Sequence, residues 1–206
     1  MAMPALGLAL SAVYVMLAFG LRMFVQLRRT GSTGLTSPRA IKGTAERVSG
    51  SLLVVAVLMC LAGQALQLTG AIAPPEALLG WVADVIGSGL VCAGIAITLI
   101  AQFAMGDAWR IGVDPGERTE LVVDGLFARV RNPIYAAMIP AFIGIALLSA
   151  NAVTIAGAVL VIVALELQTR LVEEPYLAVV HGESYSAYAA QVGRFLPGIG
   201  RLRSNL

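Results

Sequence analysis

The sequence predicts an all-α integral membrane protein, with five transmembrane helices, a C-terminal helical hairpin and an interfacial helix on the cytoplasmic surface. Hydrophobic residues make up 58% of the 206 residues and charged residues 13%, whereas a soluble domain has about 25% charged residues. The mean hydropathy of +0.85 agrees. We expect a single membrane domain over residues 1–206, with three transmembrane helices in residues 1–105. A net charge of +2 is too small to indicate a nucleic acid partner.

The five predicted spans are hydrophobic runs, most of them close to the ~20 residues that a bilayer-crossing helix needs. They extend from about Leu6 to Leu27, Val48 to Leu68, Leu78 to Met105, Ile134 to Leu148 and Ala152 to Leu171. The fourth run is short, and residues 149–151 leave room only for a tight turn, so the last two runs are predicted to form a helical hairpin. The first run has no basic segment before it, so we do not expect a cleaved signal peptide.

Basic residues fall only in alternate connections, and this asymmetry predicts the orientation, because basic loops stay on the cytoplasmic side. The basic side holds Arg28, Arg29, Arg39, Lys42, Arg47, Arg110, Arg118, Arg129, Arg131, Arg194, Arg201 and Arg203. The connections around residues 69–77 and 149–151 hold none. We therefore expect the N-terminus outside and the C-terminus in the cytoplasm.

The few potential metal ligands do not form a pattern. Cys60 and Cys92 lie inside hydrophobic runs without a CxxC or Cys/His spacing, and His181 is the single histidine. This inventory predicts neither a disulfide framework nor a metal site.

Charged residues recur along one stripe at the end of the last hydrophobic run. Glu166, Arg170, Glu173 and Glu174 are spaced at i, i+4, i+7 and i+8, which places them on one helix face. Pairing of Glu166 with Arg170 would make the stripe structural, but it leaves two adjacent carboxylates, which gain from a cationic or hydrogen-bonding partner. We therefore expect Glu173 and Glu174 to belong to a site. Pro175 should kink this helix or start a new one.

Two further segments are predicted at the same cytoplasmic surface. Before the fourth run, Asn132 can act as an N-cap and Pro133 suits the first helical turn, while Tyr135 is either an interfacial belt residue or a site residue. After the fifth run, residues 176–191 have helical spacing, with Tyr185 and Tyr188 on one side. This segment is either a lid over the glutamates or an interfacial anchor.

Six segments in order resemble the isoprenylcysteine carboxyl methyltransferase and phospholipid methyltransferase group of small membrane enzymes, including bacterial members. They are Gly106-Asp107-Ala108-Trp109-Arg110, Leu121-Val122-Val123-Asp124-Gly125-Leu126-Phe127, Arg131-Asn132-Pro133-Ile134-Tyr135, Glu173-Glu174, His181-Gly182-Glu183-Ser184-Tyr185-Ser186-Ala187-Tyr188 and Arg194-Phe195-Leu196-Pro197. Asn132 departs from the more usual histidine and His181 from phenylalanine. An earlier Gly87-Ser88-Gly89 also matches, but it falls in the outer half of its span, so we expect Gly87 and Gly94 to permit close helix packing instead.

The resemblance implies that residues 106–206 bind S-adenosylmethionine and that a lipophilic or lipid acceptor, bearing a carboxylate, amine or thiol, arrives from the bilayer of a bacterial inner membrane. The implied cofactor-binding residues are Arg131, Asn132, Pro133, Tyr135, Glu173, Glu174 and Tyr185. Arg131 would bind the cofactor carboxylate through a bidentate fork. The implied catalytic residues are Glu173, Arg170 and Arg110, with the arginines holding the acceptor head group. The alternatives are a membrane reductase of the steroid 5-alpha-reductase type using NADPH, and a non-enzymatic scaffold.

Overall fold

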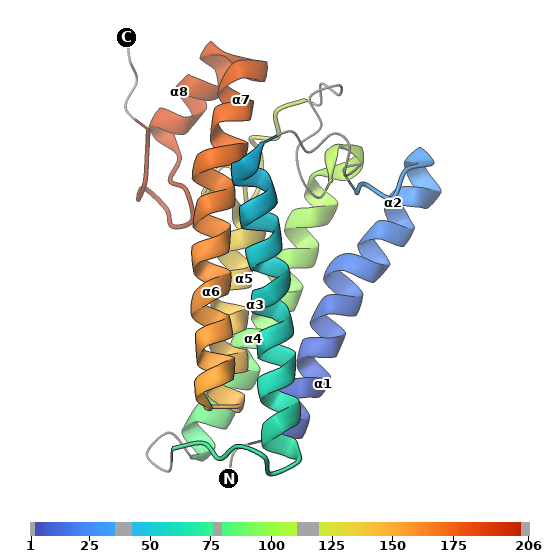
Figure 1. Cartoon of the computed structure of the whole chain (residues 1–206). Helices are drawn as coiled ribbons and strands as arrows, with labels where there is room; N and C mark the ends of the chain where they lie inside the picture. Colours follow the sequence, from blue (N-terminus) through green and yellow to red (C-terminus); the bar gives the residue numbers. More distant parts are fainter. Residues whose placement is uncertain (1–2, 36–42, 76–79, 111–119, 203–206) are drawn as a thin grey trace.

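The computed structural model describes residues 3–35, 43–75, 80–110 and 120–202, and this part of the chain is helical (Figure 1). A first long helix consists of α1 (Pro4–Val15), the π-helical stretch η1 (Met16–Leu21) and α2 (Arg22–Thr30). It is followed by α3 (Thr44–Leu68), α4 (Trp81–Ala104), the short 3-10 turn η3 (Gly106–Ala108), α5 (Pro133–Leu148) and α6 (Ala152–Gln168). The chain continues through the π-helical stretch η4 (Thr169–Glu173), α7 (Glu174–His181) and α8 (Glu183–Gln191).

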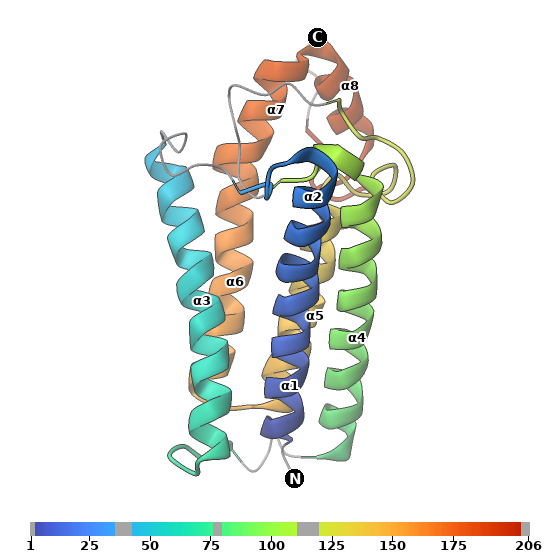
Figure 2. The same ribbon diagram turned by 90° about the vertical axis from the view of Figure 1, so that its right-hand side faces the viewer.

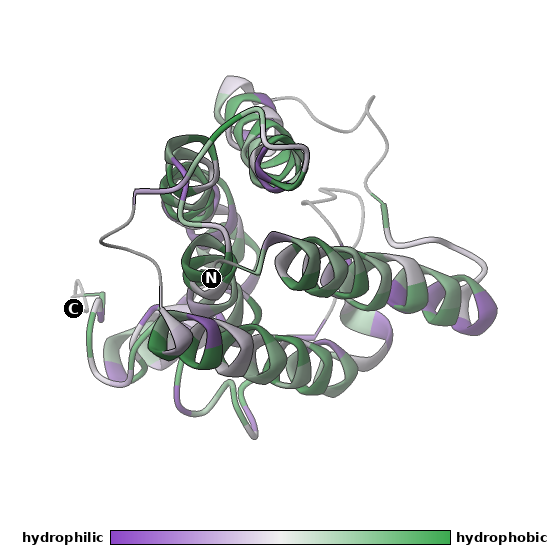
Figure 3. Ribbon diagram, turned by 90° about the horizontal axis from the view of Figure 1, so that it is seen from below, coloured by the Kyte–Doolittle hydropathy of each residue, from purple (hydrophilic) through white to green (hydrophobic). Residues whose placement is uncertain are grey.

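Among the described residues, four helices are long and apolar enough to cross a membrane: Pro4–Thr30, Thr44–Leu68, Trp81–Ala104 and Ala152–His181. The fifth expected span, α5, forms, but its 16 residues extend only about 24 Å against a hydrocarbon core of about 30 Å. A full crossing by α5 therefore stays a prediction. The expected start of the third span at Leu78 lies outside the described residues. Apolar residues colour most of the circumference of these helices (Figure 3), as lipid-facing surfaces require.

Pro175 was expected to kink this helix or start a new one, and it lies in the first turn of α7, where α-helical geometry resumes after a π-helical stretch, although the helical run is continuous from Ala152 to His181. Proline clashes with the carbonyl one turn earlier, and that carbonyl belongs to Leu171, within the π-helical stretch Thr169–Glu173. The wider π-helical turn relieves the clash, so the proline is absorbed without ending the helix.

The bundle packs as two tight pairs, α4 with α5 and α3 with α6, and the hairpin α5–α6 joins them. The first helix crosses over α5 and contacts α3 and α4 (Figure 2). A Cβ added to Gly94 would lie 2.6 Å from the Cβ of Ala141, and one added to Gly87 would lie 2.8 Å from the carbonyl oxygen of Gly144. Both glycines therefore permit the close approach of α4 to α5, as predicted.

The predicted tight turn between the hairpin helices is stabilised by Asn151, which is buried. Its side-chain nitrogen donates to the carbonyl of Gly63 at 3.1 Å and to Gln67 at 2.7 Å, and its oxygen accepts from the backbone nitrogen of Thr154 at 2.9 Å. The hairpin is thereby fastened to the end of α3.

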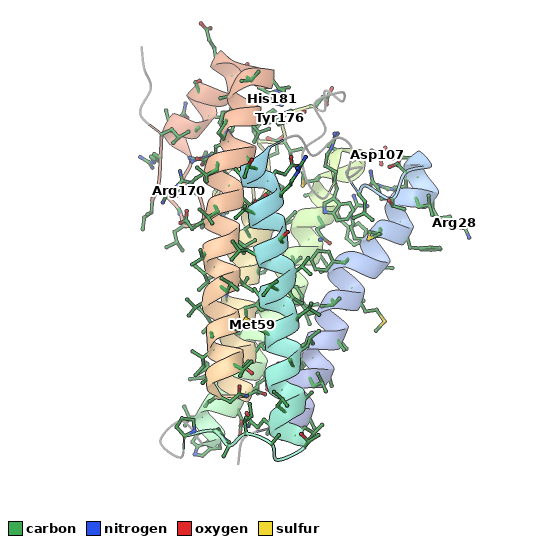
Figure 4. The ribbon with its side chains drawn as sticks, viewed as in Figure 1. Arg28, Met59, Asp107, Arg170, Tyr176 and His181 are labelled. Atoms are coloured by element: carbon green, nitrogen blue, oxygen red, sulfur yellow. The ribbon has the colours of Figure 1, made fainter. Side chains whose placement is uncertain are left out.

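The helices alternate in direction, so the basic segments meet at one end of the bundle. In Figure 4, Arg28, Asp107, Arg170 and His181 lie at this end, far from the N-terminus. We call it the basic end. The predicted convergence of the basic segments is confirmed for the described residues, whereas the compartment that this end faces stays a prediction.

Candidate functional site

A cavity of about 220 Å³ lies at the basic end and continues down between the helices. Its lining comes from three parts of the basic side that are far apart in the sequence: the stretch at Trp109 and Arg110, residues 131–135, and part of the segment from Arg170 to Tyr188. Of the predicted site residues, those that line it are Arg110, Arg131, Asn132, Pro133, Tyr135, Glu173 and Tyr185. Arg170 and Glu174 are not among its lining residues.

The cavity has two chemically different halves. Its polar half is defined by Arg110, Asn132, Glu173, Tyr176, His181 and Tyr185. It lies at the basic end, where Figure 4 labels Tyr176 and His181. Its membrane half, which we define by Tyr14, Ala18, Phe19, Leu53, Thr98 and Met138, lies between the first helix, α3, α4 and α5. A ligand that is polar at one end and apolar at the other matches this division.

Glu173 is the carboxylate that faces the cavity from the long α6–α7 helix. It accepts a short hydrogen bond of 2.5 Å from the Tyr135 hydroxyl and a long one of 3.4 Å from Gln168. The Gln168 amide oxygen in turn accepts from Ser49 at 2.6 Å, which fixes the glutamine against α3. Both partners of Glu173 are neutral, and no ion pair between it and another described residue is present. The carboxylate is thus oriented but not neutralised.

Glu174 points the other way and is buried in an ion cluster. Its carboxylate receives one hydrogen bond of 2.6 Å from Arg131 and two of 2.8 Å from Arg194. These bonds raise the pKa of Arg194 above its usual value. Successive helical residues differ by about 100° in direction, so adjacent carboxylates serve different neighbours. Glu174 anchors the segment after α8 rather than a ligand.

The free bidentate fork expected of Arg131 is not present. One terminal nitrogen donates to the carbonyls of Ala189 and Val192, and the other to Glu174 and to the carbonyl of Gly200 at 3.0 Å. Only its Nε is left without a partner. The segment after α8 therefore occupies the groups that were expected to bind a cofactor carboxylate.

Asn132 differs from its expected role as well. It occupies the N-cap position of α5, but its side chain makes no capping hydrogen bond. Its side-chain nitrogen donates instead to the Arg194 carbonyl at 3.3 Å, and its backbone nitrogen to the same oxygen at 3.1 Å. Pro133 begins α5, as predicted.

The segment after α8 runs beside the start of α5 through a parallel bridge between Val130 and Gly193. The backbone nitrogen of Arg131 donates to the Gly193 carbonyl at 2.8 Å. A Cβ on Gly193 would lie 2.0 Å from the Leu196 carbonyl oxygen, so only glycine fits this turn. The close backbone contact fixes the wall of the cavity formed by residues 131–135.

The helix α8 folds back over the cavity, which favours the lid over the interfacial anchor. Tyr185 is buried, and both Tyr185 and Tyr188 line the cavity with ring centroids 6.3 Å apart. The Tyr188 hydroxyl donates to the Phe127 carbonyl at 2.7 Å. Burial raises the pKa of both tyrosines to about 12, so they are neutral donors at physiological pH.

Arg170 lies outside this arrangement. Its Nε donates to Glu166 at 2.5 Å, and its side chain is 57% exposed. Glu166 and Arg170 therefore pair with each other, which is the structural alternative that the sequence analysis considered. The predicted catalytic role of Arg170 has no support from its position, because an exposed, paired side chain away from the cavity does not reach a ligand there.

The sequence analysis missed Arg22, which is fully buried within the first helix. Its guanidinium lies 4.6 Å from the ring centroid of Trp109 and donates to the Gly106 carbonyl at 2.5 Å. Four residues further along, Gln26 donates to the Asp107 carbonyl at 2.9 Å. These bonds fix the η3 turn and the cavity wall at Trp109. An arginine inside a hydrophobic run was the available signal.

Apolar helices long enough to cross a membrane, with a cavity at one end that holds an oriented carboxylate, define the class as an integral membrane protein with a candidate ligand site. The sequence model of the phospholipid methyltransferase family matches residues 82–184, half of the chain. The chain belongs to the phospholipid methyltransferase family, a family of membrane methyltransferases. The match contains Arg131, Tyr135 and both glutamates, and it leaves out the first helix and Tyr185. No curated protein matches the sequence.

Proposed function

We propose that this protein transfers a methyl group from S-adenosylmethionine to a lipophilic or amphiphilic acceptor at the membrane surface. The observation that carries the proposal is Glu173, a carboxylate that lines the cavity with only neutral partners among the described residues. A poorly solvated carboxylate is stabilised by an opposite charge, and S-adenosylmethionine carries a sulfonium and an ammonium group.

The residues of the polar half fit such a cofactor. Tyr135 and Gln168 hold the Glu173 carboxylate in one orientation, while Tyr176 and Tyr185 supply aromatic surface for a cation or an adenine ring. Arg131 contributes by fixing the wall that carries Asn132 and Tyr135. When bound, S-adenosylmethionine supplies a methyl group whose S–C bond breaks, leaving its electron pair on sulfur, while a lone pair of the acceptor forms the new bond.

The protein has no covalent chemistry to perform in such a transfer. Alignment of the acceptor with the methyl group and removal of water supply most of the acceleration, and α8 over the cavity provides the cover. Arg110 lines the same cavity and is placed to hold an anionic acceptor head group, whereas Arg170 is not.

We further propose that the basic end faces the cytoplasm of a bacterial cell, with the N-terminus outside. The support is the charge asymmetry between the two ends of the bundle. A reporter enzyme fused after Leu206 and active only inside the cell supports this orientation, and one active only outside contradicts it.

The test of function is calorimetry with S-adenosylmethionine and S-adenosylhomocysteine on the detergent-solubilised protein. We expect micromolar affinity, about −8 kcal/mol, for the parent. The Glu173→Gln variant should bind about 10- to 100-fold more weakly, because a hydrogen bond to a charged group is worth about 1.5–3 kcal/mol. Glu166→Gln is the matched control, since Glu166 lies two turns earlier on the same helix, paired with Arg170, and should bind like the parent.

Each contrary outcome has a distinct meaning. Equal binding by the parent and Glu173→Gln would remove Glu173 from the site. Binding of NADPH without S-adenosylmethionine would establish the reductase alternative, and binding of neither would favour the scaffold.

A further inference from the structure

The end of the membrane half that lies farthest from the basic end is closed by Tyr14 of the first helix, and we call this residue the floor of the cavity. Tyr14 is 1% exposed, its hydroxyl lies 3.0 Å from the Thr98 hydroxyl of α4, and its ring packs edge-on against Phe142 at 5.9 Å. Beyond it the core is filled by residues such as Val91 and Ile145, each at most 1% exposed. The ring of Tyr14 therefore closes the cavity.

The depth of this half is short on the scale of a membrane. Along α4 the cavity is lined from Thr98 to Met105, seven residue steps, which correspond to about 10 Å of helix. Half of the hydrocarbon core is about 15 Å. An apolar chain of full acyl length does not fit above Tyr14 within this depth.

The side walls suit a slender apolar group. Ala18 lies one turn above Tyr14 and offers only a methyl group to the cavity, and Gln102 opposite is held by its hydrogen bond of 2.8 Å to the Ala18 carbonyl. Phe19 and Leu53 line the cavity from the first helix and α3, and both are partly exposed.

We infer that the methyl acceptor is an amphiphile with a short apolar group that occupies the membrane half, and that Tyr14 determines the longest chain accepted. This inference rests on the proposed function, whose reacting centre lies in the polar half. Residues 4–30 lie outside the family match at 82–184, so the specificity determinant lies in a part of the chain that the family does not define.

The test uses straight-chain alkylamines and fatty acids of increasing length, on protein in lipid nanodiscs. Two readings are taken for each probe: methyl transfer from labelled S-adenosylmethionine, and thermal stabilisation of the protein without S-adenosylmethionine. Partition of a probe into the bilayer is the same for every variant, so it cancels in the ratio of variant to parent.

Tyr14→Ala removes the floor, and its ratio to the parent should stay near one for short chains. Beyond the longest chain that the parent accepts, the ratio should rise about fourfold per added methylene. Tyr14→Phe keeps the ring and should leave the length profile unchanged. Ala18→Leu should fill the space above the floor and reject chains that the parent accepts. Val91→Ala is the control for a core cavity that does not line the site.

An unchanged length profile in both Tyr14→Ala and Ala18→Leu would overturn the inference, even if methyl transfer proceeds. A shift of the same size in Val91→Ala would also overturn it, because loosening of the core would then explain the effect. If Tyr14→Ala does not fold, Ala18→Leu decides the matter alone. Failure of the proposed function is recognised separately, as absence of S-adenosylmethionine binding, and the stabilisation series still tests the floor in that case.

Discussion

The adjacent carboxylates Glu173 and Glu174 should respond in opposite ways to the same substitution. Glu174→Gln removes the charge that three hydrogen bonds from Arg131 and Arg194 share. It leaves two guanidinium groups in a site where all three side chains are at most 10% exposed. Breaking a buried ion pair from one side costs about 3–5 kcal/mol. Glu173→Gln removes no ion pair among the described residues, and its amide still accepts from Tyr135.

This difference should be visible in thermal unfolding followed by intrinsic fluorescence in detergent. For a chain of about 200 residues, each kcal/mol corresponds to about 2–4 °C, so Glu174→Gln should lower Tm by about 6–20 °C. Glu173→Gln should melt within about 2 °C of the parent and bind S-adenosylmethionine about 10- to 100-fold more weakly. Measured well below its Tm, Glu174→Gln should retain much of that binding.

A double-mutant cycle separates the ion cluster from other causes. Adding Arg194→Gln to Glu174→Gln removes one of the stranded charges, so the pair should be less destabilised than the sum of the single variants by about 1–3 kcal/mol. Strict additivity would refute the ion cluster as the source of the loss. A normal Tm for Glu174→Gln together with lost ligand binding would refute the assignment of the two glutamates.

Two further predictions concern helix packing and pH. Gly94→Leu should lower the stability by at least about 1–3 kcal/mol through overpacking, because a Cβ there meets Ala141, whereas Gly89→Leu meets nothing within 4 Å and should have the Tm of the parent. The raised pKa of about 12 for Tyr185 and Tyr188 means that, above about pH 10, tyrosines ionise in the unfolded chain before they do in the folded one. The free energy of unfolding should therefore fall between about pH 10 and 12, by about 2–3 kcal/mol for each tyrosine. Tyr185→Phe should show a shallower decline, and an equally steep decline in that variant would contradict the raised pKa of Tyr185.

The helices were predictable because their signal is local. A run of about 20 apolar residues bounded by arginines needs no tertiary information, and the boundaries at Leu68 and Leu148 agree with the structure. The prediction was least secure for α5, which is shorter than a full span and packs against α4 and α6.

The candidate site was predictable as a set of segments but not as a set of roles. The adjacent positions of Glu173 and Glu174 explain why they point in different directions, but the role of Glu174 depends on Arg194, which is twenty residues further along the chain. The docking of a loop cannot be read from residue spacing. For the same reason the guanidinium of Arg131 was expected to be available to a ligand, whereas it donates to backbone carbonyls of Val192 and Gly200 in the segment after α8.

Arg22 shows a different limit. Its charge inside a hydrophobic run was visible in the sequence, but its meaning depends on the η3 turn and Trp109, more than eighty residues later. The sequence analysis assigned it no role. In the structure Arg22, together with Gln26, joins the first helix to the cavity wall.

The parallel bridge between Val130 and Gly193 also has a consequence for the order of events during biosynthesis. Residues 193–200, which hold the start of α5 in place, leave the ribosome after every long helix has been made, and domains generally acquire structure from the N-terminus onward. The bundle can therefore be inserted while Arg131 still lacks the carbonyl of Gly200 and the Glu174 carboxylate still lacks Arg194. A newly made chain would reside in the bilayer as an open, inactive bundle, and it would acquire its ligand site only when this last segment docks.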